Sequence, residues 1–466
     1  MAFCNDPGNP FYIGVILDKY SLSNANFQLL QSNSTQPESL PREIGVVGLA
    51  ANAMNLTIGS GIFVLPALVA ASVGAASVLA YVACGVLITL IMLCFAEVGS
   101  KVTSTGGAYA YVETAFGPFA GFLTNSLFWF GYAMMSDAAI ANALVDTLSV
   151  PFPALAHFAN KAIFLTVLFA FFAWINIRGV KQGTRLVEIN TLAKLIPLLL
   201  LIVVGIFFIE PTNLQWTSTP SIKSLGEVSL VLFFAFIGLE ASLSVSGEIK
   251  NPTKTVPKGI LLGLAGVLVV YLLLQTVAQG VLGNDLPNEK EAPLAVVAQR
   301  IFGNWGLTLI IIGAAISMFG TVSGDILASP RLIYAAAKDN LLPAFFGRIH
   351  AKYTTPHIAI ITYSALGLIF ALSGGFQQLA ILASAATLVI YLAVVLATIK
   401  LRFTQKSPEG SFKIPGGIII PCFAILAIGW FLSNLKREET LALLAFLAIT
   451  AVFYLAFKAF RKRSIS

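Results

Sequence analysis

The stretch Ile58-Gly59-Ser60-Gly61-Ile62-Phe63 interrupts an apolar segment that is long enough to cross a membrane. A second stretch, Phe234-Ala235-Phe236-Ile237-Gly238-Leu239-Glu240, interrupts another such segment five spans later. In hydrocarbon, an unpaired backbone N–H or C=O costs several kcal/mol, so a helix opens only where the freed groups line a cavity or hold a ligand. Corresponding breaks in two halves of a membrane chain are typical of a transporter. We therefore predict that the two breaks form the binding site.

The composition places most of the chain in lipid. Of its 466 residues, 57% are hydrophobic and 11% are charged, whereas a soluble domain is about 45–50% apolar and about 25% charged. Long uncharged stretches, such as the one between Glu43 and Glu97, leave room for one or two spans of about 20 residues each. Counting these stretches predicts an all-α integral membrane protein with twelve transmembrane helices.

Lys and Arg in the loops predict the orientation, because cytoplasmic loops retain positive charge. With both ends inside, 20 of the 28 basic residues fall on the inner side and six on the outer side. We therefore expect a multi-pass protein of the cytoplasmic (inner) membrane with both termini cytoplasmic. Inner loops beside anionic lipid account for the net charge of +7, so no nucleic-acid partner is implied.

The chain divides into three parts. Residues 1–41 are polar and rich in Asn, Ser, Gln and Pro, which predicts a disordered N-terminal tail. Residues 42–460 form the membrane domain, and residues 461–466 form a basic cytoplasmic tail. Spans one to five and six to ten each open with an interrupted segment, which indicates a 5+5 inverted repeat followed by two C-terminal helices. Residues 291–302 are too short to cross and are expected to form an external surface helix.

Cysteine and histidine are scarce. The four cysteines and three histidines show no metal-ligand or disulfide spacing, so we expect no metal and no other cofactor. No extracellular cysteine offers a bridge to an accessory subunit, and none is implied. The chain lacks a phosphate-binding Gly-Lys-Ser/Thr loop, which leaves a gradient as the driving force.

Four motifs lie in and beside the predicted spans. They are IGSGIF at residues 58–63, FFAFIGLE ending at Glu240, EIKNPTKTVP at residues 248–257, and RLIYA at residues 331–335 with Lys-Asp-Asn at 338–340. Together they resemble the amino acid permease branch of the amino acid, polyamine and organocation transporter superfamily. The resemblance implies transport by alternating access, in which spans one, two, six and seven rock against a scaffold.

The first break is predicted to bind the carboxylate of an α-amino acid. The N-terminus of the second half-helix carries about half a positive charge and presents N–H groups to an anion. Gly61 lets the unwound backbone approach the ligand, and Ser60 adds a hydroxyl donor. Thr57, directly before the break, belongs to the same candidate set. The alternative is a notch of small residues that only lets helices pack closely.

The second break is predicted to bind the substrate ammonium group, because a half-helix ends there in unpaired carbonyls with a partial negative charge. The resemblance implies that the carbonyls of Phe234, Ala235 and Ile237 hold the amine. It also implies that the Phe234 ring is the thin outer gate, with simple packing as the alternative. Phe236 completes the candidate set. This Phe-rich span favours substrates with apolar or neutral side chains.

Lys194 is a candidate coupling residue. It lies nine residues beyond Arg185, or about 13 Å of helix rise, which places its ammonium near mid-membrane, where it needs a partner. The resemblance implies that this lysine replaces the cation that bridges spans one and eight in sodium-coupled relatives. That match argues against sodium coupling. Two roles stay open, a fixed structural cation, which we favour, and a lysine that titrates during transport.

Glu240 and Asp137 are the other coupling candidates. Glu240 follows the second break, where a helix N-terminus stabilises its carboxylate, but an ionisable group inside a span can also bind and release a proton. Asp137 either recognises a cationic side chain, carries a proton, or faces an outer vestibule. Asp325, six residues before Arg331, is interpreted as a cavity carboxylate or an ordinary helix-end charge.

These features predict a sodium-independent secondary transporter of amino acids, driven by protons or by exchange. A membrane sensor or channel without net transport is one alternative. An intramembrane enzyme is another, but it would need a nucleophile with its base, paired aspartates or a metal cluster within the spans, and none is evident. Paired aspartates are not indicated, because Asp137 and Asp325 lie on unlike motifs. The expected partners are the amino acid, membrane lipid and protons.

Overall fold

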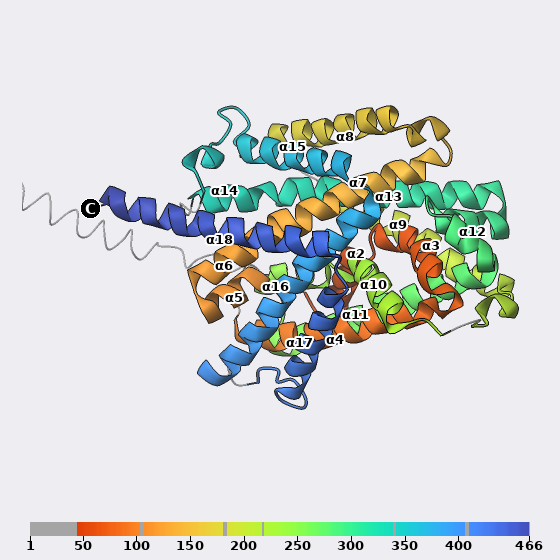
Figure 1. Ribbon diagram of the computed structural model, residues 1–466, viewed down its shortest axis with the longest axis horizontal. Coiled ribbons are helices and arrows are strands. Elements are labelled where there is room, and N and C mark those ends of the chain that lie inside the picture. Colours follow the sequence, from red (N-terminus) through yellow and green to blue (C-terminus); the bar gives the residue numbers. More distant parts are fainter. Residues whose placement is uncertain are drawn as a thin grey trace, which may run out of the picture. The chain divides into compact units, whose positions relative to one another are not determined.

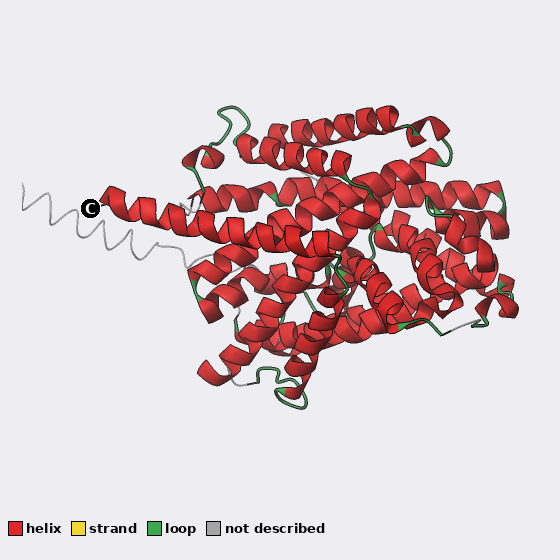
Figure 2. Cartoon of the chain, viewed as in Figure 1, coloured by secondary structure: helices red, strands yellow, loops and turns green. Residues whose placement is uncertain are grey.

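The computed structural model describes residues 44–102, 107–179, 184–216, 219–338, 342–405 and 410–465. The predicted N-terminal tail, residues 1–41, lies outside these ranges. Within them the regular structure is helical, and the β-type pairing is limited to one isolated bridge between Ile44 and Ile249. Figure 2 shows this helical character along the chain. The prediction of an all-α chain is therefore confirmed.

The first predicted break is present. Helix α2 (Val46–Thr57) ends where Ile58 leaves helical geometry with a ψ of 87°, and helix α3 (Gly61–Val73) begins after three non-helical residues. Helix α2 packs against α11 (Pro252–Leu282), whereas α3 packs against α10 (Ile222–Leu232). The two halves of one apolar segment therefore have different main neighbours.

The second predicted break is also present. Helix α10 continues into a 3₁₀ helix, η6 (Phe233–Phe236). Ile237 is then extended, Gly238 has a φ of +115°, and a further 3₁₀ helix, η7 (Leu239–Glu248), follows. Because η7 packs against α2 while α10 and η6 pack against α3, each half of the second segment pairs with one half of the first.

The remaining helices lie between and after these two segments along the chain (Figure 1). The longer ones are α4 (Ser77–Lys101), α5 (Ala108–Phe116), α6 (Pro118–Ser126), the π-helix η2 (Leu127–Met134), α7 (Met135–Ser149), α8 (Phe158–Arg178), α9 (Thr184–Gly205), α12 (Pro293–Phe302), α13 (Asn304–Ala328), α14 (Pro330–Lys338), α15 (His357–Ser373), α16 (Phe376–Thr404), α17 (Ile419–Ser433) and α18 (Arg437–Ile465). Short 3₁₀ connections are η1 (Gly74–Ala76), η3 (Pro153–Ala156), η4 (Ile206–Phe208), η5 (Pro211–Leu214), η8 (Gly283–Asn288) and η9 (Ala344–Gly347).

Much of the described chain has the length and apolarity of membrane spans. Eight helical segments qualify: Gly61–Lys101, Phe158–Arg178, Thr191–Phe208, Ile222–Leu243, Pro252–Asn288, Asn304–Lys338, Phe376–Thr404 and Arg437–Lys458. Helices α2, α12, α15 and α17 are shorter apolar helices. Helix α12 is the short helix expected at residues 291–302. The count of twelve spans and the 5+5 repeat stay predictions.

Large apolar side chains lie exposed on several helices. On α8 they are Phe158, Ile163, Val167, Phe171 and Trp174, and on α18 they are Leu441, Leu444, Ile449, Val452 and Leu455. A soluble monomer rarely exposes contiguous apolar patches beyond a few hundred Å², whereas lipid tails can cover them. The chain is therefore an integral membrane protein, as predicted.

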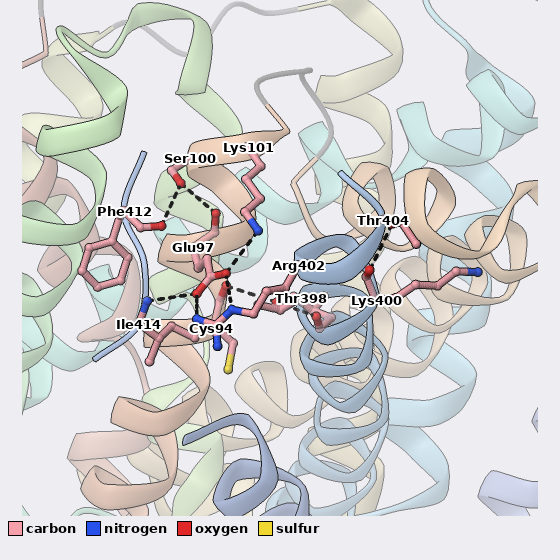
Figure 3. Close-up of polar contacts among 11 residues, drawn as sticks. Cys94, Glu97, Ser100, Lys101, Thr398, Lys400, Arg402, Thr404, Phe412 and Ile414 are labelled. Carbon is pink, nitrogen blue, oxygen red and sulfur yellow. Dashed lines mark hydrogen bonds and ion pairs between the residues drawn. The ribbon is translucent and has the colours of Figure 1, made fainter. Parts of the chain in front are cut away.

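A buried ion-pair cluster joins α4, α16 and the segment before α17 (Figure 3). The Glu97 carboxylate accepts hydrogen bonds from Arg402 at both oxygens, one of them from Nε at 2.9 Å. Lys101 Nζ lies 3.2 Å from Oε1 of Glu97, and the backbone N–H of Ile414 donates to Oε2 at 2.9 Å. Charged donors strengthen such bonds. The cluster therefore holds three separate segments against one carboxylate.

We expect Glu97→Ala to lower the stability of the protein. The substitution leaves Arg402 and Lys101 without their carboxylate partner, and breaking a buried pair costs about 3 kcal/mol. Thermal unfolding of the purified protein should show a clear fall in Tm. Glu438→Ala, which removes an exposed carboxylate at the start of α18, is the control and should leave Tm unchanged. A Glu97→Ala variant with the wild-type Tm would contradict this role.

Candidate functional site

The two breaks lie directly against each other. A Cβ atom added to Gly61, the first residue of α3, would lie only 3.0 Å from Cα and Cβ of Ala235. One added to Gly238 would lie 2.7 Å from the carbonyl oxygen of Leu56, in the last turn of α2. Gly238 also has a φ of +115°, which favours glycine. The glycines therefore allow the two unwound segments to touch.

Tyr271 of α11 links the two breaks. Its hydroxyl lies 3.0 Å from the carbonyl oxygen of Thr57 and 2.8 Å from that of Ala235, so its single hydrogen can be donated to either acceptor or shared between them. The ring is fully buried, with the rings of Tyr81 and Phe236 packed edge-on against it. One side chain from a neighbouring helix thus lies within hydrogen-bond distance of carbonyl groups at both breaks, where the helices leave carbonyl groups without regular N–H partners.

We expect Tyr271→Phe to impair both stability and transport. The substitution keeps the ring but removes the hydroxyl from two buried carbonyls, and an unsatisfied buried polar group costs about 1–3 kcal/mol. Uptake by proteoliposomes should fall about tenfold, since 1.4 kcal/mol corresponds to a factor of ten. Tyr334→Phe, in a partly exposed residue of α14, is the matched control. Equal uptake by the two variants would argue against the link.

The start of α3 retains the features predicted for a carboxylate cradle. The first N–H groups of a helix have no intrahelical partner, and the Ser60 side chain does not cap those of α3. The Thr57 hydroxyl donates to the carbonyl oxygen of Ala53 at 2.8 Å, within α2. Thr57, Ser60 and Gly61 are all buried. The N–H groups at this terminus therefore lie away from bulk water.

The carbonyl groups at the second break are partly occupied. The Phe234 carbonyl accepts a hydrogen bond from the N–H of Ile237 at 3.5 Å, and the Ala235 carbonyl accepts one from Tyr271. The Phe234 ring packs edge-on against Phe376 of α16, with centroids 5.6 Å apart. Phe236 is fully buried against Tyr271, which is a packing role. An arriving ammonium group would share these acceptors.

Glu240 is fixed to the second break by one of its oxygens. Oε2 accepts hydrogen bonds from the backbone N–H of Gly238 at 3.1 Å and from the hydroxyl of Tyr391, on α16, at 2.5 Å. Oε1 accepts none from the described residues, although the side chain is only 6% exposed. The carboxyl group therefore has a capacity for one more donor or for a proton.

Lys194 of α9 reaches the first break. Its ammonium donates a hydrogen bond to the carbonyl oxygen of Asn55, in the last turn of α2, and the residue is only 4% exposed. Thr191, one turn earlier on α9, donates to the side-chain oxygen of Asn55 at 2.9 Å. A cation is stabilised at the C-terminal end of a helix, where carbonyl groups gather. Lys194 therefore neutralises the end of α2.

A cavity of about 680 Å³ adjoins both breaks. It touches the end of α2 at Asn55 and Leu56, and it touches the second break at Gly238. Of the predicted site residues, Lys194 lines this cavity. The predicted substrate-binding residues are buried and are absent from its lining: Thr57, Ser60, Gly61, Phe234, Ala235, Phe236 and Ile237. Helices α7, α8 and α13 supply an apolar wall.

The structure corrects one interpretation of Asp137. Asp137 of α7 has no exposed surface, so it does not face a vestibule. Its Oδ2 accepts a hydrogen bond from the Tyr363 hydroxyl of α15 at 2.8 Å, whereas Oδ1 accepts none from the described residues. Asp325 lies on the cavity wall, in the last turn of α13. Helix α13 packs against α7, which carries Asp137.

Sequence reasoning missed the tyrosines at this site. Tyr271, Tyr363 and Tyr391 each hydrogen-bond to a predicted or candidate site residue from another helix. A phenol hydroxyl within an apolar span has to find a buried partner, so each tyrosine was a usable signal. Tyr132 is a further case, since it lies in the π-helix η2 and lines the cavity. Single π-helical turns are frequent at functional sites.

Comparison with known sequences identifies relatives along nearly the whole chain. A family model described as amino acid permease matches residues 44–457. The chain is 26% identical over 454 residues to the branched-chain amino acid permease of Bacillus subtilis, an alignment that covers 94% of this chain and 97% of that protein.

Two further relatives are named as exchangers of different amino acids. The serine/threonine exchanger of Bacillus subtilis is 28% identical over 417 residues, with 88% of this chain and 94% of that protein covered. The arginine/ornithine antiporter of Latilactobacillus sakei is 28% identical over 393 residues, with 80% and 82% covered. The three relatives share the class of cargo and differ in its side chain.

Proposed function

Because the chain belongs to the amino acid permease family, we propose that it transports α-amino acids across the cytoplasmic membrane as a sodium-independent secondary active transporter. The contact between the two helix breaks is the observation that supports this most directly. It brings the N–H groups at the start of α3 close to carbonyl groups at Ala235 and its neighbours. Those two sets of groups match the carboxylate and the ammonium of one zwitterion.

The proposed topology has twelve spans, with both termini in the cytoplasm. The pairing of α2 with η7, and of α3 with α10, supports a mechanism in which the halves of the interrupted segments move as units. Alternating access then exposes the breaks first to one side and then to the other. Phe234, packed on Phe376, is the proposed outer gate.

Lys194 supports the proposal of sodium independence. Its ammonium already donates to the end of α2 beside the first break, so a positive charge is built into this position. A sodium ion bound next to this ammonium would be repelled in a region of low dielectric. The driving force is then a proton gradient or exchange for a second amino acid.

The cavity supports a preference for apolar or neutral side chains. A substrate held at the breaks can extend its side chain into the 680 Å³ cavity. The far wall carries Leu144, Leu148, Phe164 and Leu168, which would remove an apolar side chain from water. The relative named as a branched-chain permease is consistent with this proposal.

Counterflow in proteoliposomes tests the proposed function. Vesicles loaded with unlabelled amino acid should accumulate the same amino acid in radiolabelled form, without any ion gradient. Leucine, isoleucine, valine, serine and lysine, tested separately, would identify the preferred class, and replacing sodium with choline should not change the rate. A sensor or an enzyme accumulates no label, so the absence of counterflow with all amino acids would reject the proposal.

A further inference from the structure

One face of helix α8 combines aromatic rings with a basic end. Phe171, Trp174 and Arg178 are spaced by three and four residues, which places them on one side of the helix. The guanidinium carbon of Arg178 lies 4.2 Å from the centroid of the Trp174 ring, and that ring stacks against Phe171 with centroids 6.5 Å apart. Phe171 and Trp174 are 42% and 51% exposed. The row of side chains is therefore open to whatever surrounds the helix.

The row continues onto helix α13, which packs against α8. The ring centroid of Phe319 lies 6.3 Å from that of Phe171 and 4.7 Å from that of Phe172. Phe172 is buried, whereas Phe319 is 40% exposed and also lines the 680 Å³ cavity. A molecule that binds along the row therefore rests against a wall of that cavity.

A second basic residue lies at the same end of α8. The loop before α15 reaches this end, where the Thr355 hydroxyl donates to the carbonyl oxygen of Ile177 at 2.6 Å. Lys352 belongs to that loop, with its ammonium 5.5 Å from the ring centroid of Tyr353. Figure 1 shows α8 and α15 side by side. The end of α8 and the start of α15 therefore share one basic and aromatic surface.

The positive charge of this surface has no carboxylate partner among the described residues. Residues 171–179 and 342–360 contain no Asp or Glu. Arg178 and Lys352 are exposed, and neither forms an ion pair with a carboxylate that the structure describes. One cation offsets the partial negative charge at the C-terminal end of a helix. Two exposed cations leave an excess of positive charge, which attracts an anion.

The aromatic face has the length of one leaflet. Val167 is exposed one turn before Phe171, and it lies 11 residues before Arg178. At 1.5 Å per residue this distance is about 16 Å of helix, close to half of the roughly 30 Å hydrocarbon core of a bilayer. Trp174 then lies near the membrane–water interface, where tryptophan is enriched. An apolar chain can therefore lie along the row while its charged head group meets Arg178.

We propose that this face binds one anionic phospholipid. Arg178 and Lys352 hold its phosphate, and one acyl chain lies along the rings of Trp174, Phe171 and Phe319. The inference rests on the proposed topology, in which the Arg178 end of α8 faces the anionic cytoplasmic leaflet. A second copy of this chain on the same face would bring like charges together, because the row and the adjoining loop carry no carboxylate.

Thermal unfolding of the purified protein in detergent tests the head-group site. Dioleoyl phosphatidylglycerol should raise the Tm of the wild type by about 3 °C or more, because a ligand that binds the folded state stabilises it. Dioleoyl phosphatidylcholine and inorganic phosphate at the same concentration should not. Arg178→Gln/Lys352→Gln should lose most of the rise. The control Lys254→Gln/Lys258→Gln, at two exposed lysines of α11, removes the same charge and should respond like the wild type.

Fluorescence quenching tests the path of the acyl chain and stays decisive if the glutamine variants do not fold. Brominated acyl chains quench a nearby tryptophan, and the signal of Trp174 is the difference between the wild type and Trp174→Phe. In phosphatidylcholine vesicles, a minor fraction of brominated phosphatidylglycerol should quench Trp174 more than the same fraction of brominated phosphatidylcholine does. The exposed Trp305, at the start of α13, is the internal control and should respond equally to both lipids.

Four results would overturn the proposal. The first is a wild-type Tm that phosphatidylglycerol does not raise, or that phosphatidylcholine or inorganic phosphate raises equally. The second is a full rise in Arg178→Gln/Lys352→Gln, and the third is equal quenching of Trp174 by the two brominated lipids. The fourth is a dimer in light scattering that Trp174→Phe converts to a monomer, which would assign the face to a second copy. None of these measurements requires uptake, so their failure leaves the transport proposal standing, whereas absent counterflow rejects transport alone.

Discussion

Gly238→Ala is expected to abolish transport. The alanine Cβ would lie 2.7 Å from the carbonyl oxygen of Leu56, which is backbone and cannot rotate away. The φ of +115° is also a conformation that side-chain-bearing residues rarely adopt, at a cost of about 1–3 kcal/mol. The second break would have to move away from α2. A misplacement of about 1 Å in groups that position a ligand can lower a rate about 100-fold, and we expect a loss of this size in initial uptake.

A matched glycine variant separates this local effect from a general loss of helix flexibility. Gly429→Ala, in α17, introduces a Cβ with no atom within 4 Å and without a positive φ. Both variants should be purified, checked for a single symmetric peak by size exclusion, and compared at equal protein per vesicle. Wild-type uptake by Gly238→Ala would mean that the contact between the breaks is not needed for transport.

Lys194→Met is expected to produce the second largest loss. Methionine retains most of the apolar stem but removes the ammonium that donates to Asn55, so the carbonyl-rich end of α2 loses its positive charge. An unsatisfied buried group costs about 1–3 kcal/mol, which corresponds to about tenfold or more in uptake. Lys258→Met, at an exposed lysine of α11, is the control and should retain wild-type uptake.

The same variant decides between the two roles left open for Lys194. A fixed cation holds α2 in place throughout the cycle, so Lys194→Met should lose counterflow and gradient-driven uptake together. If Lys194 instead carries the transported proton, Lys194→Met should lose only gradient-driven uptake. The hydrogen bond to the backbone of Asn55 favours the fixed role, because that acceptor belongs to α2 itself. Retained counterflow in Lys194→Met would contradict the fixed role.

The positions of both breaks could be predicted from local sequence. Gly59, Ser60 and Gly61 weaken a helix and leave backbone groups open, and Gly238 is needed for a positive φ, so these signals are properties of single residues. Helix rise counted from Arg185 likewise placed Lys194 inside a span, and the residue is buried. Features that depend on one helix alone are therefore accessible from the sequence.

Contacts between distant helices could not be predicted in the same way. Asp137 and Tyr363 are 226 residues apart, and their hydrogen bond depends on which faces of α7 and α15 pack together. Where almost every position of a span is apolar, the sequence carries little information about which face of the helix points into the bundle. The partners of the Tyr271 hydroxyl could not be predicted for the same reason, since a tyrosine in an apolar span indicates that a polar partner exists without identifying it.

The tyrosine between the two breaks would also restrict the chemistry of a substrate that binds at the proposed site. A phenol has a single hydrogen, so at any instant Tyr271 can satisfy Thr57 or Ala235 fully, and not both. One of these two buried carbonyl oxygens therefore lacks a full hydrogen bond from Tyr271. A primary amine can complete that set because it brings hydrogens of its own. A quaternary ammonium such as that of a betaine carries charge but no N–H. It would leave the second carbonyl oxygen without a hydrogen-bond donor.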